Sequence, residues 1–320
     1  GGGARRPADA GIRHRHPGPG RRAVSSLTRT RLVAYAVAAP LLSFLDRAAP
    51  LEASVLGSSS TSAYLLAGDF VIALTGRAVP LMPNGLGLVQ THGLDVFHTG
   101  ARAQVTGDEI RTGGVVVSLT RAEVCEVDVA RNENYRAQDV AKRGRDLLGA
   151  LGLDASSDLA DALARARPEF AAAGGLRGSG HLIAALHHRD PGSAAEASLE
   201  LIGRGPGLTP DGDDLLTATA AATIAFECPA ELAGETSRSL RAAMLPADLH
   251  RRTGALPATL LRLAVEGHVI EPVCSILDLS TSKQTWVRAL TRLQRIGHGT
   301  GRTYAVGCAL TALSLSQNNL

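Results

Sequence analysis

The sequence predicts an α+β protein in which an N-terminal antiparallel β domain, either a sheet or a partial barrel, precedes a mainly α-helical domain. Short β-rich runs bounded by Gly or Asp recur between about residues 51 and 129, and no helical pattern separates them. After Asn132 the chain becomes rich in alanine, and apolar residues recur at helical spacing. Because strands do not alternate with helices, a doubly wound nucleotide-binding fold is disfavoured.

Two boundaries divide the chain into three segments in this prediction. Residues 1–31 form a basic leader without an apolar period, which we expect to be disordered. Residues 32–132 form the strand-rich domain, and residues 133–320 form the helical domain that carries two glycine-rich loops. The apolar run at residues 32–45 is expected to be the first helix of the folded body.

The individual elements are read from their pattern and from the residues that bound them. The expected strands lie at residues 63–66, 70–74, 85–89, 94–97, 115–119 and 124–129. The expected helices lie at residues 137–151, 158–166, 180–188, 194–202, 213–226, 231–245, 257–266, 272–277, 283–293 and 303–315. No internal repeat relates these segments to one another.

The net charge of +3 is the sum of two unlike parts. Residues 1–31 contain eight arginines and one aspartate, and therefore carry a charge of +7. The rest of the chain carries −4, so the folded body is mildly acidic. Nucleic-acid binding is disfavoured, because such proteins concentrate basic charge on the folded surface and because aromatic residues make up only 3% of the chain.

The sequence favours a cytoplasmic protein that does not bind membranes. Arg21-Arg22 before an apolar run is similar to a twin-arginine secretion signal, but Arg29 and Arg31 interrupt the approach to that run. No apolar run approaches the roughly 20 residues that span a bilayer. The four cysteines lie far apart without a Cys-x-x-Cys pair, as expected for reduced thiols in a core.

The most informative stretch for function is residues 203–216, Gly-Arg-Gly-Pro-Gly-Leu-Thr-Pro-Asp-Gly-Asp-Asp-Leu-Leu. Its glycines permit left-handed turns and a close approach to a ligand, and Thr209-Pro210 is a natural N-cap followed by proline at the first helical position. The helix that follows is apolar on most faces, so the loop leads into a buried helix N-terminus, which is typical of an anion site. The candidate substrate-binding residues here are Gly205, Gly207, Thr209 and Gly212.

Three acids, Asp211, Asp213 and Asp214, stand at the start of that helix, and they exceed what helix capping needs. In one interpretation they bind Mg²⁺ or orient a polar substrate. Mg²⁺ is the only cofactor that the sequence suggests. In another, Asp213 or Asp214 acts as a general base. A third alternative, a solvated and capped turn without any catalytic role, has about equal weight from the spacing alone.

The second stretch is residues 296–304, Ile-Gly-His-Gly-Thr-Gly-Arg-Thr-Tyr, which is another glycine-rich turn before an apolar helix. His298 lies between glycines, where it has little packing role, so a ligand contact or an acid–base role is favoured. Hydroxyl and guanidinium groups in the same turn offer donors to an anion. The candidate substrate-binding residues are Gly297, Gly299, Thr300, Gly301 and Arg302. We expect both stretches to face one small-anion site.

These motifs resemble a known family. Gly205-x-Gly-Leu-Thr-Pro-x-Gly-Asp-Asp-x-Leu and Ile296-Gly-His-x-x-Gly are similar to the signatures of the oxamate carbamoyltransferase subunit family of allantoin utilisation and purine degradation. Residues 253–267 are similar to the helix between those signatures, and the resemblance covers roughly residues 50–315. The chain departs from the pattern at Asp211, where the family usually has Ser, and at Gly299-Thr300, which replace paired serines.

The resemblance implies a subunit that acts with other subunits in carbamoyl transfer between carbamoyl phosphate and oxamate, giving oxalurate and phosphate, or the reverse. In that reaction His298 would polarise the carbonyl group and stabilise an oxyanion. Asp213 or Asp214 would accept the proton of the attacking amide nitrogen. The alternative function is a non-catalytic module that binds a small carboxylate or phosphate and regulates or scaffolds a partner.

Overall fold

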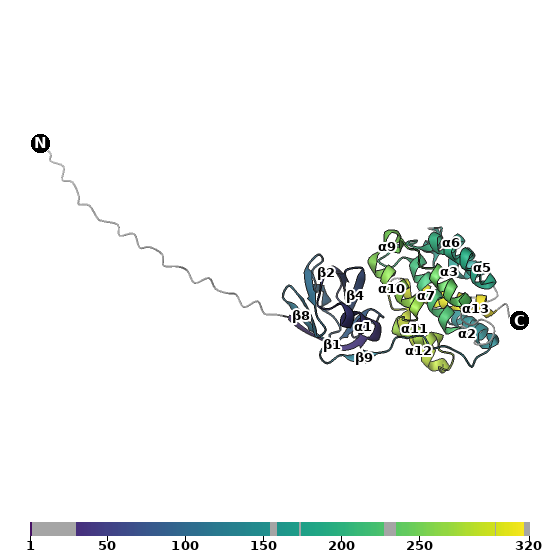
Figure 1. Cartoon of the computed structure of the whole chain (residues 1–320), viewed down its shortest axis with the longest axis horizontal. Coiled ribbons are helices and arrows are strands. Elements are labelled where there is room, and N and C mark those ends of the chain that lie inside the picture. The colour runs from purple at the N-terminus through teal and green to yellow at the C-terminus, as the bar shows by residue number, and fades with distance from the viewer. Residues whose placement is uncertain (2–29, 154–158, 173, 227–234, 298, 317–320) are drawn as a thin grey trace.

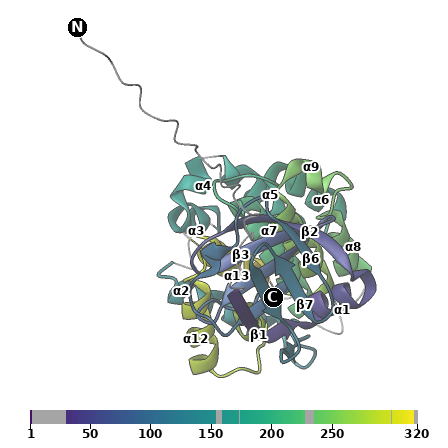
Figure 2. The ribbon, with the colours of Figure 1, turned by 90° about the vertical axis from the view of Figure 1, so that its left-hand side faces the viewer.

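A computed structural model describes residue 1 and residues 30–153, 159–172, 174–226, 235–297 and 299–316. The expected basic leader therefore lies almost wholly outside the described residues. The described chain forms a β-barrel followed by a helical region (Figure 1). Figure 2 looks along the long axis, with the barrel in front of the helices. This arrangement confirms the predicted α+β class.

The barrel contains nine strands within the described residues: β1 (Thr30–Ala38), β2 (Leu51–Ser58), β3 (Ser62–Ala67), β4 (Phe70–Gly76), β5 (Gly85–Leu88), β6 (Arg102–Val105), β7 (Glu109–Thr112), β8 (Val115–Ser118) and β9 (Glu123–Cys125). They are ordered β5-β4-β3-β2-β6-β7-β8-β1-β9, and a further pairing of β5 with β1 closes an eight-stranded ring. Most neighbours are antiparallel, as predicted, but β1–β8, β1–β9 and β4–β5 are parallel.

The expected first helix at residues 32–45 is partly wrong. Its first half is β1, and only the second half is helical, as α1 (Ala39–Ala48). The local sequence is rich in alanine, but β1 pairs with β5, β8 and β9, and this tertiary pairing overrides helix propensity. Pro40, in the first turn of α1, suits the start of a helix, where its missing N–H has no partner to lose.

A second difference concerns the strands themselves. The expected strand at residues 94–97 is instead the short 3-10 helix η1 (Leu94–Val96), which begins after Gly93 in a left-handed conformation, with φ of 93°. The strands β2, β6 and β7 have no counterpart among the expected runs. In β6 polar and apolar residues alternate, because only one face of the strand lies in the barrel core.

The helical region comprises α2 (Ala137–Ala150), α3 (Leu159–Ala166), α4 (Pro168–Ala172), α5 (Gly175–His188), α6 (Pro191–Leu201), α7 (Asp211–Ala225), α8 (Glu235–Ala243), α9 (Leu249–Arg252), α10 (Ala255–Glu266), α11 (Glu271–Leu277), α12 (Lys283–Leu293) and α13 (Thr300–Ser316). Every residue of α7 is buried, as the apolar sequence predicts. In α13 all but Thr300 and Arg302 are buried. These two helices pack on each other at the centre, with α2 and α10 beside them (Figure 1).

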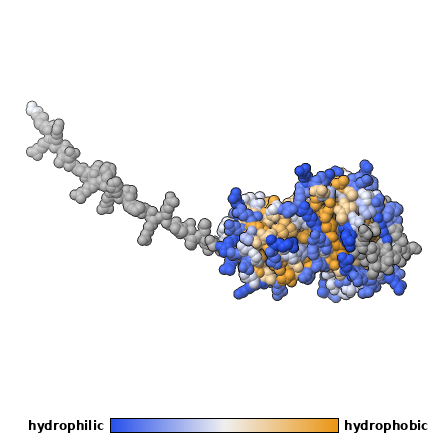
Figure 3. Space-filling model, in the orientation of Figure 1, coloured by the Kyte–Doolittle hydropathy of each residue, from blue (hydrophilic) through white to orange (hydrophobic). Residues whose placement is uncertain are grey.

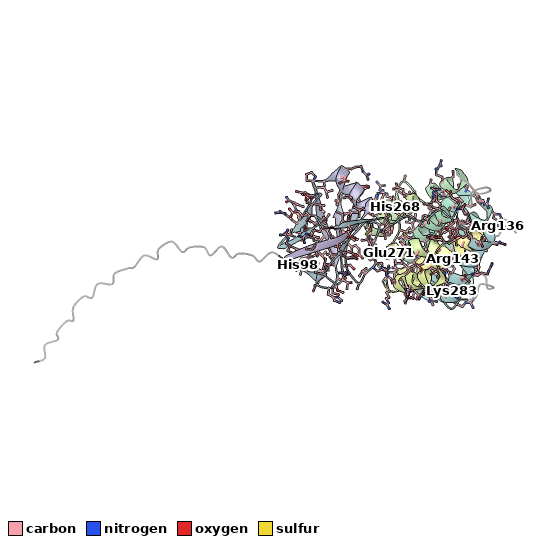
Figure 4. The ribbon with its side chains drawn as sticks, turned by 90° about the horizontal axis from the view of Figure 1, so that it is seen from below. His98, Arg136, Arg143, His268, Glu271 and Lys283 are labelled. Carbon is pink, nitrogen blue, oxygen red and sulfur yellow. The ribbon has the colours of Figure 1, made fainter. Side chains whose placement is uncertain are left out.

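The barrel and the helical region are joined by specific contacts. Thr259 of α10 accepts a hydrogen bond from the backbone N–H of Val71 in β4, at 3.1 Å. The guanidinium of Arg262 lies 2.8 Å from the carboxylate of Asp69, in the turn between β3 and β4. His268 contacts Asp128 by side chain and by a backbone bridge, and Figure 4 labels His268 where the helical region meets the barrel.

Among the described residues, none of the helices combines the length and the apolar character that crossing a bilayer requires. Figure 3, in the view of Figure 1, shows apolar residues over the visible face of the barrel and over the adjoining helices.

Candidate functional site

The structure brings the two glycine-rich stretches together where α7 and α13 begin. The hydroxyl oxygens of Thr209 and Thr300 lie 3.0 Å apart, and the hydroxyl of Thr303 donates to Asp211 at 2.7 Å. We call this set the helix-start cluster; its members are Arg167, Thr209, Asp211, Asp213, Asp214, Thr300 and Thr303. The expected convergence of the two stretches is therefore present in the geometry.

The loop before α7 folds back over the start of the helix. Gly205 and Gly207 adopt left-handed conformations, with φ of 113° and 102°, and a side chain at Gly205 would lie 2.9 Å from the backbone nitrogen of Asp211. The carbonyl of Arg204 accepts the N–H of Gly212 at 2.9 Å. One of the N–H groups that the sequence offered to an anion is thus already bonded within the chain.

The expected cap of α7 is wrong in one respect. The N-cap is Pro210, and no side chain caps the first turn. The hydroxyl of Thr209 instead donates to the carboxylate of Asp214, at 3.3 Å, and contacts Thr300. Thr209 thus bonds to a buried acid and not to the helix backbone. The N–H of Gly212, in the first turn of α7, already donates to the loop carbonyl of Arg204.

Two of the candidate substrate-binding glycines are required by packing. A side chain at Gly212 would lie 2.0 Å from the carbonyl oxygen of Leu201, and one at Gly301 would lie 1.7 Å from that of Leu293. Close approach of the backbone therefore accounts for these two glycines without a ligand. A side chain at Gly299 would meet only the guanidinium of Arg167, the end of a flexible side chain that can move.

Asp211 is neutralised by an arginine that the sequence reading missed. Arg167 lies between α3 and α4, with its Nε 2.8 Å from Oδ1 of Asp211 and an Nη nitrogen 2.9 Å from Oδ2. Asp211 is 2% exposed, so an unpaired charge there would be costly. The sequence around Arg167 gives no sign of this role. The only indication was the third acid at the start of α7, because a buried carboxylate needs a cation nearby.

Asp213 connects two segments that are distant in sequence. Its carboxylate accepts hydrogen bonds from the backbone N–H of Gly203, at 3.1 Å, and from the hydroxyl of Thr253, at 2.6 Å. Burial raises the pKa of Asp213, and these two hydrogen bonds oppose the increase. Asp213 therefore holds the glycine loop against the segment that precedes α10.

Asp214 lies beneath the two threonine hydroxyls and is 2% exposed. Burial raises its pKa well above the ordinary value, hydrogen bonds from Thr300 and Thr209 oppose this increase, and the charges of Asp211 and Asp213 add to it. Asp214 thus keeps its proton to a higher pH than an exposed aspartate does. A carboxyl group with a raised pKa is suited to donate or accept a proton at a higher pH than an ordinary aspartate is.

Tyr304, one turn into α13, is a second buried group that sequence reasoning did not select. It is 1% exposed. Burial raises the pKa of its hydroxyl well above the ordinary value, and the negative charge of Asp214 raises it further. Tyr304 therefore keeps its proton to a higher pH than an exposed tyrosine does.

The remaining candidates lie apart from these acids or outside the described residues. Arg302 donates to the carbonyl oxygen of Leu151 at the end of α2, at 3.2 Å. Gly297 is left-handed, with φ of 58°, and packs against Thr300. His298, the proposed carbonyl-polarising group, lies outside the described residues.

The magnesium alternative has no geometric support. Across the described parts of the chain, no three His, Cys, Asp or Glu side chains are grouped so that they could hold a metal ion. Asp211 faces Arg167 and Asp213 faces Thr253, so the three carboxylates do not converge on one point. The geometry of the described residues therefore does not support a Mg²⁺ site formed by Asp211, Asp213 and Asp214.

Comparison with known proteins supports the resemblance. Residues 201–312 match the model of a family described as oxamate carbamoyltransferase subunit AllH, which confirms the resemblance found in the sequence motifs. The matched region contains both glycine-rich stretches, all of α7 and α10, and most of α13. A search of the curated proteins and a search of the solved structures each return no match.

Proposed function

We propose, from the match of residues 201–312 to an oxamate carbamoyltransferase subunit family, that this chain is a subunit of an enzyme that transfers a carbamoyl group between carbamoyl phosphate and oxamate. The single observation that carries the proposal is that both signatures of the matched region meet in the helix-start cluster, where the Thr209 and Thr300 hydroxyls lie 3.0 Å apart. The proposal includes a cytoplasmic location, partner subunits and a role in allantoin breakdown.

The threonine hydroxyls are assigned to substrate binding. Thr209 and Thr300 are half-buried and cover Asp214, so they are the members of the cluster that an entering molecule meets first. Oxamate and carbamoyl phosphate are small and rich in hydrogen-bond acceptors, which hydroxyl and backbone N–H groups can satisfy. The paired Arg167 and Asp211 cancel each other's charge, so the extra acid at position 211 does not repel an anion.

Asp214 is assigned to the proton that the reaction must move. When the amide nitrogen of oxamate attacks the carbonyl carbon of carbamoyl phosphate, the bond from carbon to the phosphate oxygen breaks and the nitrogen loses a proton. In the reverse direction the leaving nitrogen regains it. A buried carboxyl with a raised pKa holds that proton in the reverse reaction and receives it in the forward one. Thr209 and Thr300, which both bond to Asp214, would relay it.

The other residues have supporting roles in the proposal. His298 is retained as the group that polarises the carbonyl, on the strength of the motif alone. Arg302 is assigned to holding α13 against the end of α2, because its guanidinium already donates to Leu151. Asp213 positions the glycine loop through Gly203 and Thr253.

A non-catalytic subunit that binds a small anion is the second candidate. The observation that favours it is the burial of Asp213 and Asp214, which are 1% and 2% exposed. Carboxyl groups so enclosed serve a structural role without any contact with substrate. In this case the chain would bind oxamate or phosphate and pass no proton.

The test uses the chain together with its partner subunits. Carbamoyl phosphate formation from oxalurate and phosphate is measured for the native complex and for Asp214→Asn, which keeps the shape but cannot exchange the proton. We expect a loss of about 100-fold in kcat. Asp146→Asn, at an exposed position of α2, is the control and leaves kcat unchanged.

The same preparation separates the two candidates. If Asp214→Asn turns over as the native complex does, the catalytic assignment is wrong. The binding role then stands only if oxamate or phosphate still raises the Tm, since a ligand of the native state must stabilise it.

A further inference from the structure

A cleft of about 490 Å³ lies between the barrel and the helical region, away from the helix-start cluster. One wall is a face of α1 and the other is a face of α10, the two helices that flank the junction in Figure 1. Its size is that of a small-molecule site, and the boundary between two parts of a protein is a common place for one. None of the residues used in the proposed function lines it.

The α1 wall is a helix face that borders the barrel core, since Phe44 packs against that core while remaining partly exposed. Leu41 and Leu45 point into the barrel and are at most 1% exposed, whereas Pro40 and Phe44, one turn apart, line the cleft. The ring of Phe44 stacks on that of Phe70, with centroids 4.1 Å apart and planes at 13°. Together these side chains give the middle of the cleft an apolar surface.

The charges on the α10 wall are paired within the protein. Arg262 is bound to Asp69 at 2.8 Å. His268 contacts Asp128, and its other ring nitrogen lies 3.9 Å from Glu266. Three carboxylates thus face one guanidinium and one imidazole, so this wall carries a net negative charge.

The unpaired charges stand at opposite ends. Arg47 is exposed near the C-terminal end of α1, and Glu126 is exposed just after β9, which pairs with the part of β1 that leads into α1. Among the described residues, no hydrogen bond or ion pair engages either group. The face of α1 between them, from Ala39 to Arg47, is about 12 Å long at 1.5 Å per residue.

We propose that this cleft binds a linear zwitterion, with its carboxylate on Arg47, its ammonium group at Glu126, and its apolar body on Pro40 and Phe44. A basic amino acid and an ω-amino carboxylate share this chemistry. The site is independent of the carbamoyl-transfer proposal, because it involves neither α7 nor α13.

The probe is 6-aminohexanoate, titrated calorimetrically into the full chain. Hexylamine lacks the carboxylate, hexanoate lacks the ammonium group, and glycine has both charges too close together. We expect each of the three to bind at least about tenfold more weakly than the probe, since each loses a charge-assisted contact. L-Lysine and L-arginine, as further arms, distinguish a basic amino acid from an ω-amino carboxylate.

Two variants locate the site. Arg47→Gln and Glu126→Gln each weaken 6-aminohexanoate at least about tenfold, whereas Arg102→Gln, at an exposed position on β6, leaves the affinity unchanged. Both cleft positions are exposed, so an unchanged thermal melt is expected to show that the variants fold. The absence of any heat of binding overturns the proposal, as does equal binding of hexylamine and the probe, or an equal loss in Arg102→Gln.

Discussion

At the helix-start cluster, three carboxylates are at most 2% exposed and each has a partner from the chain itself. In the cleft between α1 and α10, the charges of Arg47 and Glu126 are exposed, and no partner engages them within the described chain. Both regions contain charged side chains, but these side chains have different roles. Buried charge holds the fold together and shifts pKa values, whereas exposed and unpaired charge remains free for a ligand.

The largest expected effect concerns the close packing at the start of α13. In Gly301→Ala the new methyl group would lie 1.7 Å from the carbonyl oxygen of Leu293, so the start of α13 must move. We expect a loss of about 4 kcal/mol in the free energy of unfolding, measured in urea. The control is Gly180→Ala within α5, where nothing lies within 4 Å of the added carbon. The free energy of unfolding of this variant should equal or slightly exceed that of the native chain.

The next effect tests the buried pair. Arg167→Met leaves Asp211 without its cation, and we expect a loss of about 3 kcal/mol in the free energy of unfolding. The double variant Arg167→Met with Asp211→Ser removes the stranded charge, so it should be more stable than the single variant. If the two are equally unstable, the arginine acts through packing and not through its charge.

A smaller effect depends on pH. The native state holds the Asp214 proton more tightly than the unfolded chain, so the contribution to stability is complete below the unfolded pKa of about 4 and is lost as pH rises through the raised native pKa. Asp214→Asn cannot lose a proton. Its free energy of unfolding should therefore fall less than that of the native chain between pH 5 and pH 8.

The urea measurement at both pH values carries its own control. Asp146→Asn, at an exposed position on α2, should follow the native pH dependence. A native chain whose stability does not change between the two pH values contradicts the raised pKa of Asp214.

The smallest effect belongs to the cleft. Arg47→Gln and Glu126→Gln should change the free energy of unfolding by no more than about 0.5 kcal/mol, because both side chains are exposed and unpaired. A larger loss in the thermal melt would show that these charges serve the fold, and the contrast between the two regions would then disappear.

The sequence predicts best where a pattern is local. The burial of α7 follows from a run that is apolar on all sides. The pairing of β1 with three later strands has no local signal, and the apolar run that includes this strand was predicted to be helical. Contacts between distant residues escape any reading of local pattern.

The glycines illustrate the same limit from the other side. Gly212 and Gly301 were interpreted as ligand contacts, but each lies where the backbone of another segment passes too close for a side chain. Arg167 was missed because its partner, Asp211, is 44 residues away in the sequence. A glycine or an acid reveals that something approaches it, and only the structure identifies what approaches.

The early position of β1 has a consequence for synthesis. This strand is made before the others, yet its neighbours include β8, through Thr30 and Val115, and β9, through Ala38 and Cys125. During translation one edge of β1 can pair with β5 once Leu88 has emerged from the ribosome, but the other edge stays open until β8 and β9 follow. Open strand edges attract other chains. The barrel therefore closes late, by contacts that are distant in sequence and slow to form, and a nascent chain halted before β9 would be the species that chaperones have to protect.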